Sequence, residues 1–355
     1  MVGINNKRDT MKKIISKVTL FVAVIILLTS CGKNENKTGA AIQTDKLKSV
    51  AVGNDKFSLR YKFEKGEKFT YKLSTEVTND ESVKADSVAR SNVKQNLNYI
   101  FECEVIDVDN DKVAEINIKV NDIKLDATYN GQKITYHSGD KKLTQQDKLK
   151  FLEYETIYDT PFRARVSPKG EVIEVSRLEK MVEKMNNMSP QKQNLTTEQK
   201  SAYAKQLGET ALKPMMQMVF REQPEQSIMK DSTWEKRVPQ QLGTLTMENI
   251  ARFKVLDFVD VDGEKAAKIS ASLSASFSGK NEGTENGITY NFGKPEIGGN
   301  GMIYFNVDSG KLIKADTGTK SLLTVTMTGK NSAQKVQKTV RTTSSANRTI
   351  IELLK

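Results

Sequence analysis

The sequence predicts a mainly β fold of the β-rich α+β class, with two related curved antiparallel sheets and an inserted pair or trio of helices. Apolar and polar residues alternate with a period of two in the early and late parts of the chain, which is typical of half-buried strands. Between these parts, apolar residues recur at helical spacing. A short segment of the early part also recurs in the late part, which indicates duplication of a β unit.

Residues 1–30 have the layout of a secretory signal peptide. Basic residues precede a short apolar run, Val18–Leu28, and the small residues Thr29 and Ser30 lead to Cys31. The run is shorter than the roughly 20 apolar residues that a membrane-spanning helix needs. A cytosolic protein with a buried apolar segment near its start is the alternative, and it fits the charge, length and cysteine position less well.

The sequence Leu28-Thr29-Ser30-Cys31 resembles the lipobox of bacterial lipoproteins. In that family the cysteine receives a diacylglycerol, the peptide is cut just before it, and the new amino terminus is usually acylated. The resemblance implies lipid attachment at Cys31, a membrane as partner and a location in the cell envelope. Gly32 stands where many lipoproteins of the inner membrane have aspartate, which favours the outer membrane. Residues 31–54 are small and polar and predict a flexible tether.

The first β unit is expected over residues 55–175. Aromatic and aliphatic residues alternate with charged ones over residues 57–73, which predicts a hairpin. Residues 97–105 and 113–125 form two longer alternating stretches separated by an acidic turn. A last pair of strands is expected around a turn at Gly170.

The helical insertion is expected over residues 176–229. Ser176–Glu179 and Thr196–Gln199 have the sequence of capping boxes, in which two side chains bond the free amides at a helix start. Apolar residues follow each at helical spacing. Pro214 is expected to kink or end the second helix, and it can begin a short third helix through Phe220.

The second β unit is expected over residues 230–355. Its segment Val259–Ile269 aligns without a gap with Ile106–Ile116 of the first unit, and each unit continues to a strand, a glycine turn and another strand. Gly310 forms that turn in the second unit. Residues 279–301 are rich in glycine, asparagine and glutamate and predict a loop.

Three further segments resemble a group of uncharacterised Bacteroidota-type envelope lipoproteins, a domain of unknown function. They are Tyr61–Lys72, Asp231–Trp234 and Gly299–Asn306. Because that group has no assigned activity, the resemblance implies a location and a β-rich fold and transfers no site residue.

Composition excludes several classes of function. The formal net charge of +11 is spread over interspersed charges of both signs, and no basic stripe with stacking aromatics predicts a nucleic-acid partner. Two cysteines and one histidine exclude a typical zinc site. Cys103 lies on an alternating apolar face, which predicts a buried, inert thiol. His137 lies in a turn-like stretch without a nucleophile motif, which predicts a surface loop histidine. We therefore expect no cofactor and no enzymatic activity.

Asp107, Asp109 and Asp111 resemble the start of a calcium-binding loop. That loop needs glycine at its sixth position and glutamate at its twelfth, where this chain has Lys112 and Ile118. Aspartate and asparagine also tolerate the backbone angles of tight turns. The segment therefore predicts a hairpin turn rather than a metal site.

Methionine is concentrated in the helical insertion. Methionine fills irregular cores and is also common at adaptable apolar binding surfaces, so the pattern fits either helices that cover the sheets or an apolar groove. The ligand-binding candidates are the three residues beside Pro214. The methionines of this region are Met181, Met185, Met188, Met215, Met216, Met218 and Met229, and the three candidates are Met215, Met216 and Met218.

These observations favour a lipid-anchored, non-enzymatic envelope protein that binds an apolar or lipid-like ligand. The alternative is a structural or assembly protein that binds another envelope protein, and an enzyme with an unrecognised site is a third hypothesis. A ligand carrier requires an apolar cavity of a few hundred Å³. An assembly protein requires an exposed apolar patch or an unpaired strand.

Overall fold

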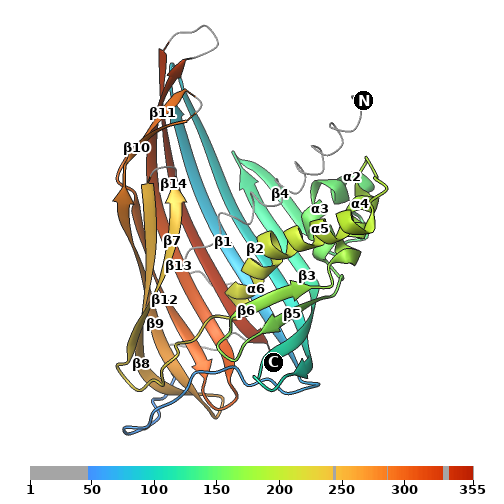
Figure 1. Cartoon of the computed structure of the whole chain (residues 1–355), viewed down its shortest axis with the longest axis vertical. Helices are drawn as coiled ribbons and strands as arrows, with labels where there is room; N and C mark the ends of the chain where they lie inside the picture. Colours follow the sequence, from blue (N-terminus) through green and yellow to red (C-terminus); the bar gives the residue numbers. More distant parts are fainter. Residues whose placement is uncertain (1–46, 243–244, 286, 331–335, 355) are drawn as a thin grey trace.

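The computed structural model describes residues 47–242, 245–285, 287–330 and 336–354, and these residues form one antiparallel sheet of fourteen strands (Figure 1). The predicted signal peptide, Cys31 and most of the predicted tether lie outside the described residues. The strands are β1 (Lys68–Lys84), β2 (Val88–Val108), β3 (Ala114–Tyr129), β4 (Gln132–His137), β5 (Phe162–Val166), β6 (Val172–Ser176), β7 (Thr233–Leu242), β8 (Leu245–Val261), β9 (Glu264–Gly279), β10 (Glu282–Glu285), β11 (Ile288–Phe292), β12 (Glu296–Asn306), β13 (Lys311–Lys330) and β14 (Val336–Leu354).

The sheet is continuous, so the prediction of two sheets is wrong. Its strands follow the order β6-β5-β3-β2-β1-β14-β13-β12-β9-β8-β7, while β4 pairs with β3 and the β10–β11 hairpin pairs with β13. The last strand, β14, pairs with the first strand, β1, from Thr70 opposite Leu354 to Lys84 opposite Val340. Because this pairing joins the two halves at the centre, neither half has a free edge there.

Both halves of the sheet have the same strand order. The first half contains the meander β1-β2-β3-β5-β6, and the second contains β7-β8-β9-β12-β13. Each has an insertion after its third strand and a turn with a positive-φ glycine, Gly170 or Gly310, between its last two strands. This order supports the duplication that we infer from the sequence.

The two aligned hairpins differ in their turns. Between β2 and β3, the side chain of Asp109 accepts hydrogen bonds from the backbone N–H groups of Asp111 and Val113 at 3.0 and 2.9 Å. Between β8 and β9, Asp262 and Gly263 both have positive φ, as in a two-residue type I′ turn. The two hairpins therefore have turns of different length, although their sequences align without a gap.

The helices of the insertion are α4 (Glu179–Met188), α5 (Thr197–Leu207), the π-helical turn η2 (Gly208–Leu212) and α6 (Lys213–Val219). The capping box from Thr196 to Gln199 is confirmed, and Pro214 lies in the first turn of α6 as expected. The capping box predicted at Ser176 is wrong, because Ser176 ends β6 and α4 begins after Leu178 without a side-chain cap.

Two further segments contain regular structure that the sequence did not predict. Two short helices, α2 (Gln145–Lys150) and α3 (Leu152–Ile157), follow β4. The predicted loop over residues 279–301 instead contains β10, β11 and the start of β12, so that prediction is wrong. Gly283, Gly298, Gly299 and Gly301 lie within strands, because the hydrogen bonds of a β-ladder are formed by the backbone and do not depend on side chains.

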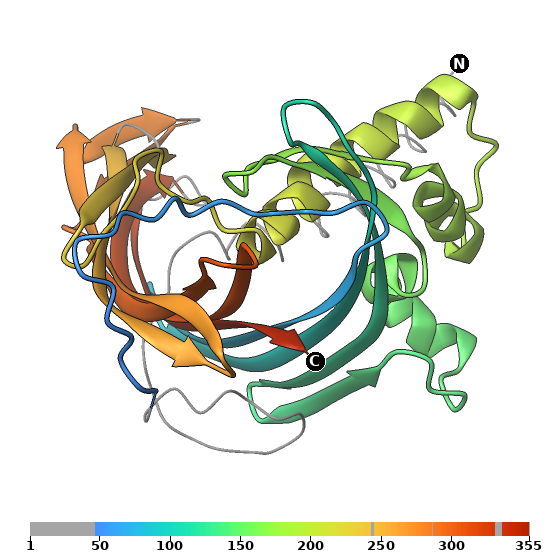
Figure 2. The ribbon, with the colours of Figure 1, turned by 90° about the horizontal axis from the view of Figure 1, so that it is seen from below.

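Residues 47–67, which we call the strap, cross the lower end of the curled sheet from one half to the other (Figure 2). Val50 N–H donates to Phe258 O in the second half at 2.8 Å, and Gly66 N–H donates to Val105 O in the first half at 2.8 Å. Residues 47–54 belong to the predicted tether, and this part of it lies against β8.

An aromatic cluster fills the lower end of the curl, where the strap, the end of α6 and the sheet meet. Phe220 is fully buried there and packs edge-on against Tyr61, Phe63 and Tyr71. Beside the cluster, the buried Lys311 donates to Lys62 O at 2.7 Å and to Glu67 Oε2 at 2.8 Å. These contacts attach the strap to the centre of the sheet.

In the described part of the chain, none of the helices combines the length and the apolar content that crossing a bilayer requires.

Candidate functional site

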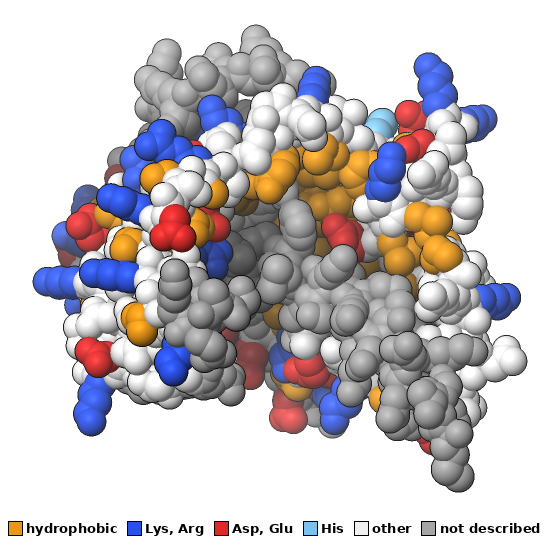
Figure 3. Space-filling model, turned by 90° about the horizontal axis from the view of Figure 1, so that it is seen from above, with side chains coloured by type: hydrophobic (Ala, Val, Ile, Leu, Met, Phe, Trp, Pro, Cys, Tyr) orange, Lys and Arg blue, Asp and Glu red, His pale blue; other side chains and the backbone are white. Residues whose placement is uncertain are grey.

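A cavity of about 750 Å³ lies between α6 with the segment that follows it and the second half of the sheet. The strands that line it are β7, β8, β9, β12, β13 and β14. Seen from above, the molecule is hollowed between its two halves, and hydrophobic side chains gather along the hollow (Figure 3). The curl of one long sheet therefore creates a concave surface that the helices only partly cover.

Alternation along the strands builds the sheet side of the cavity. Because successive side chains of a strand point to opposite faces, every second residue of a strand can line the same concave surface. Most lining residues of these strands follow this spacing: Trp234, Lys236 and Val238 of β7; Asn249, Ala251 and Phe253 of β8; and Ile269 and Leu273 of β9. Glu235 of β7, which also lines the cavity, is an exception. Most of this surface is apolar.

Trp234 is the only tryptophan of the chain and lies at the edge strand β7. Its ring stacks on that of Phe253, with centroids 5.2 Å apart and planes at 14°. Trp234 and Phe253 are also direct partners in the pairing of β7 with β8. The pair gives the cavity a flat aromatic surface that suits apolar chains or rings.

The three methionines predicted to bind ligand divide between the cavity and the core. Met218 lines the cavity beside Pro214. Met215 and Met216 are buried in the main hydrophobic core and do not line the cavity. Met181 and Met185 of α4 are buried in core clusters as well. Along α6, successive residues thus face different sides of the helix, and only one candidate points toward the cavity.

Arg221 is the feature of the site that the sequence pattern did not reveal. It follows α6, and its Nη2 donates to Thr317 Oγ1 on β13 at 2.8 Å. Its Nε atom is buried and has no hydrogen-bond partner among the described residues. Burial lowers the pKa of Arg221 to about 10, which still leaves the guanidinium charged at neutral pH.

The backbone of Arg221 is held by the aromatic cluster and by a glycine turn. Its N–H donates to the hydroxyl of Tyr61 at 3.0 Å. Gly170 lies so close that a Cβ atom there would be 2.4 Å from Arg221 O and 2.5 Å from Tyr61 Cε2. Because Gly170 also has a φ of +87°, only glycine suits this turn.

The polar part of the cavity consists of charged and polar side chains of α6 and the segment that follows it, together with polar residues of the sheet. Thr317 and Thr349 line it, and both are buried. Asn249 is 4% exposed, and its Oδ1 atom has no hydrogen-bond partner in the described part of the chain. A mostly apolar surface with a cation, an amide and hydroxyl groups fits an amphiphilic molecule, because few polar groups suffice to orient an apolar ligand.

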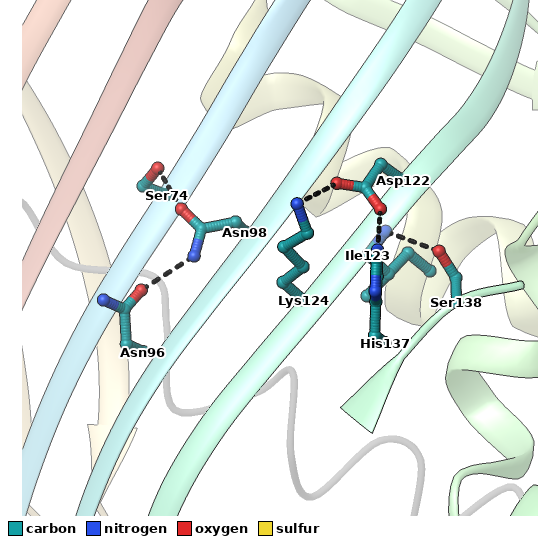
Figure 4. Close-up of polar contacts among 8 residues, drawn as sticks. All are labelled: Ser74, Asn96, Asn98, Asp122, Ile123, Lys124, His137 and Ser138. Atoms are coloured by element: carbon teal, nitrogen blue, oxygen red, sulfur yellow. Dashed lines mark hydrogen bonds and ion pairs between the residues drawn. The ribbon is translucent and has the colours of Figure 1, made fainter. Parts of the chain in front are cut away.

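The sequence candidates outside the cavity have ordinary structural positions. His137 ends β4, and its Nε2 lies 2.8 Å from Asp122 Oδ1, while Lys124 Nζ lies 3.3 Å from Asp122 Oδ2 (Figure 4). The His137 side chain is half exposed, so it lies on the surface, although in a strand rather than a loop. Cys103 is buried as predicted, and burial raises the pKa of its thiol.

Metal-ligating groups are not clustered in the residues that the structure describes: no three or more His, Cys, Asp or Glu side chains are arranged to hold an ion.

Comparisons with known proteins give a family and distant fold similarities. No curated protein matches the chain. A structure of lipovitellin, described by its lipid–protein interactions, is 8% identical with a TM-score of 0.36; the match covers 83% of this chain and 26% of lipovitellin, so this chain spans about a quarter of that protein. The COG4313 outer membrane channel from Pseudomonas putida F1 is 9% identical with a TM-score of 0.18, and the match covers 86% of this chain and 100% of the channel.

A third structure, the outer membrane protein OpdK from Pseudomonas aeruginosa, is 8% identical with a TM-score of 0.16, and the match covers 79% of this chain and 98% of OpdK. The sequence of residues 111–312, more than half of the chain, matches one family. The chain therefore belongs to the family of unknown function DUF6263.

Proposed function

We propose that this protein is a non-enzymatic binding module for an apolar or lipid-like ligand, which occupies the cavity beside α6. The observation that carries the proposal is the cavity itself, about 750 Å³ in volume, with a mostly apolar sheet side and with charged and polar side chains from α6 and the segment after it. Its volume lies within the range of about 300–1,000 Å³ that is typical of ligand pockets. The stacked rings of Trp234 and Phe253 supply a surface for an apolar chain.

The alternative, an assembly protein, has less support from the surface. The edge strand β7 contains Pro239 and the charged residues Glu235, Lys236 and Arg237, and proline and charge on an edge oppose pairing with another strand. The large hydrophobic residues that are exposed belong to separate elements: Val88, Tyr129, Ile134, Ile173, Val238, Ile288, Leu322 and Val336. Single exposed apolar residues of this kind are normal on a protein surface.

A comparison of two neighbouring methionines tests the binding function. We expect Met216→Ala to lower the free energy of unfolding by about 2–5 kcal/mol, because Met216 is buried in the core and its truncation leaves a cavity. We expect Met218→Ala to cost much less, because part of its side chain faces the existing cavity. Met218→Ala should instead weaken binding of the neutral apolar dye N-phenylnaphthylamine several-fold.

Chemical denaturation gives the two stabilities, and a fluorescence titration with the dye gives the affinity. A wild-type chain that shows no saturable rise in dye fluorescence would count against the binding function and would favour the assembly protein. A Met218→Ala variant that binds the dye like the wild type, while Met216→Ala remains folded and binds worse, would place the ligand elsewhere.

We also propose that the chain is anchored to the cell envelope, on the outer membrane, through a lipid on Cys31. The support is the sequence alone, because Cys31 lies outside the described residues. Cys31→Ser should abolish labelling by a radioactive fatty acid and should move the protein from the membrane fraction to the soluble fraction, since stable anchoring needs more than one acyl chain or signal. Unchanged recovery of the serine variant in membranes would contradict a lipid anchor at this residue.

A further inference from the structure

We propose that the ligand is an amphiphile with a single anionic head group, which Arg221 binds at the polar part of the cavity. This inference rests on the proposed function and makes it more specific, because it names the chemical class of the ligand. It follows from two properties of the described residues: the unfilled hydrogen-bonding capacity of Arg221 and the pairing of nearby carboxylates with other cations.

The guanidinium of Arg221 is only partly satisfied by the protein. Its Nη2 donates to Thr317 Oγ1, and that hydroxyl lies 3.5 Å from Thr349 O. Its buried Nε donor has no partner in the described ranges. A buried donor without a partner is unfavourable, and a carboxylate or phosphate oxygen is the acceptor that forms the strongest hydrogen bonds with a guanidinium.

The acidic residues around Arg221 already have cationic partners. Asp316 accepts from Arg348 through Nε at 3.0 Å and through Nη2 at 2.7 Å. Glu222 lies 2.6 Å from Lys236 Nζ. No ion pair within the described residues includes Arg221. The charge of Arg221 therefore lacks a direct counterion of its own.

Glu225, which also lines the cavity, forms an ion pair with Lys169. Asp316, Glu222 and Glu225 are thus paired with lysine and arginine side chains other than Arg221. Since a buried charge is unfavourable unless it is paired, an anionic ligand group would complete the site.

Asn249 is a further buried polar residue at the same cavity. Its side chain is 4% exposed, its Oδ1 atom is buried without a partner in the part of the chain described, and the residue lines the same cavity. Because Oδ1 is a hydrogen-bond acceptor, it does not bind an anionic head group, and the anion preference rests on Arg221. The apolar surface of Trp234, Phe253 and Leu273 remains for the hydrocarbon part of the ligand.

Displacement of N-phenylnaphthylamine from the full chain tests this inference with three amphiphiles that share one hydrocarbon chain. They are dodecanoate, dodecyl phosphate and the neutral dodecanol. We expect one or both anions to displace the dye about tenfold to one-hundredfold more tightly than dodecanol at neutral pH, which is the effect of a hydrogen bond to a charged group. The anion that displaces more tightly identifies the head group as carboxylate or phosphate.

Variants of Arg221 then test whether this residue causes the preference for anions over dodecanol. Arg221→Gln should remove most of the difference between anion and alcohol while dodecanol still displaces the dye, and Arg221→Lys should keep part of the difference. Arg341→Gln is the matched control, because Arg341 of β14 is 53% exposed in its side chain, and neither Arg341 nor its ion-pair partner Glu81 lines the cavity. It should leave the preference unchanged.

Equal displacement by dodecanol and both anions in the wild type would overturn the inference and would leave the apolar binding function intact. A preference that survives in folded Arg221→Gln would overturn the role of Arg221. If neither the dye nor any amphiphile binds, the proposed function fails together with the inference. The ratio of the wild-type affinities for the anions and for dodecanol tests the anion preference even if Arg221→Gln does not fold.

Discussion

Phe220→Ala is expected to lower the free energy of unfolding by about 3–5 kcal/mol, which is typical for truncation of a buried phenylalanine. Phe220 is fully buried and packs edge-on against Tyr61 and Phe63 of the strap and Tyr71 of β1. Its removal would leave a void where the strap, α6 and the sheet meet. Because Arg221 follows directly, we also expect the variant to bind amphiphiles less tightly.

Urea denaturation followed by circular dichroism measures this effect. Tyr129→Ala is the matched control, because Tyr129 is an aromatic residue of β3 that is 48% exposed. It should cost less than about 1 kcal/mol, as surface substitutions usually do. Similar losses in the two variants would show that the aromatic cluster does not hold the strap to the sheet.

Ala251→Phe is expected to abolish binding of apolar probes, with a loss of more than about tenfold in affinity, and to leave the protein folded. Ala251 lies on β8 between Lys236 of β7 and Leu273 of β9, and all three line the cavity. A phenyl ring at this position would extend into space that the ligand needs. Filling a cavity with apolar atoms commonly stabilises a protein, so loss of binding need not accompany loss of stability.

Ser272→Phe is the control for Ala251→Phe, because Ser272 is an exposed residue of the neighbouring strand β9 that does not line the cavity. It adds the same ring outside the site and should bind probes like the wild type. Titration with N-phenylnaphthylamine and thermal denaturation would be compared for both variants. Unchanged probe binding by a folded Ala251→Phe protein would show that this cavity is not the binding site.

The local elements of the fold could be predicted from the sequence because their signals are local. Alternation indicates most of the strands, the segment from Thr196 to Gln199 indicates the start of α5, and Gly170 and Gly310 indicate turns. Residues 57–63 also alternate but belong to the strap and form no strand, so the hairpin predicted over residues 57–73 is wrong. The continuous sheet could not be predicted in this way. It depends on pairing between β1 and β14, near opposite ends of the described chain, and alternation does not specify the partner of a strand.

The candidate site was predictable only in part, for a related reason. Of the three candidates in the methionine-rich segment, only Met218 lines the cavity. Arg221 lies in a segment without periodicity, and its partner Thr317 is far away in sequence. The strand that contains Trp234, β7, was not predicted, and which of its faces is concave follows only from the curvature of the whole sheet.

Fluorescence of Trp234 offers the most direct measurement of the central claim, that an amphiphile occupies this cavity. Trp234 is the only tryptophan of the chain and lines the cavity, so it reports on this site alone. We predict that dodecanoate with bromine on its terminal carbon quenches Trp234 in a saturable manner, that unbrominated dodecanoate competes with it, and that Ala251→Phe removes the saturable part. Quenching that rises linearly without saturation, and that is the same in the wild type and Ala251→Phe, would contradict the account.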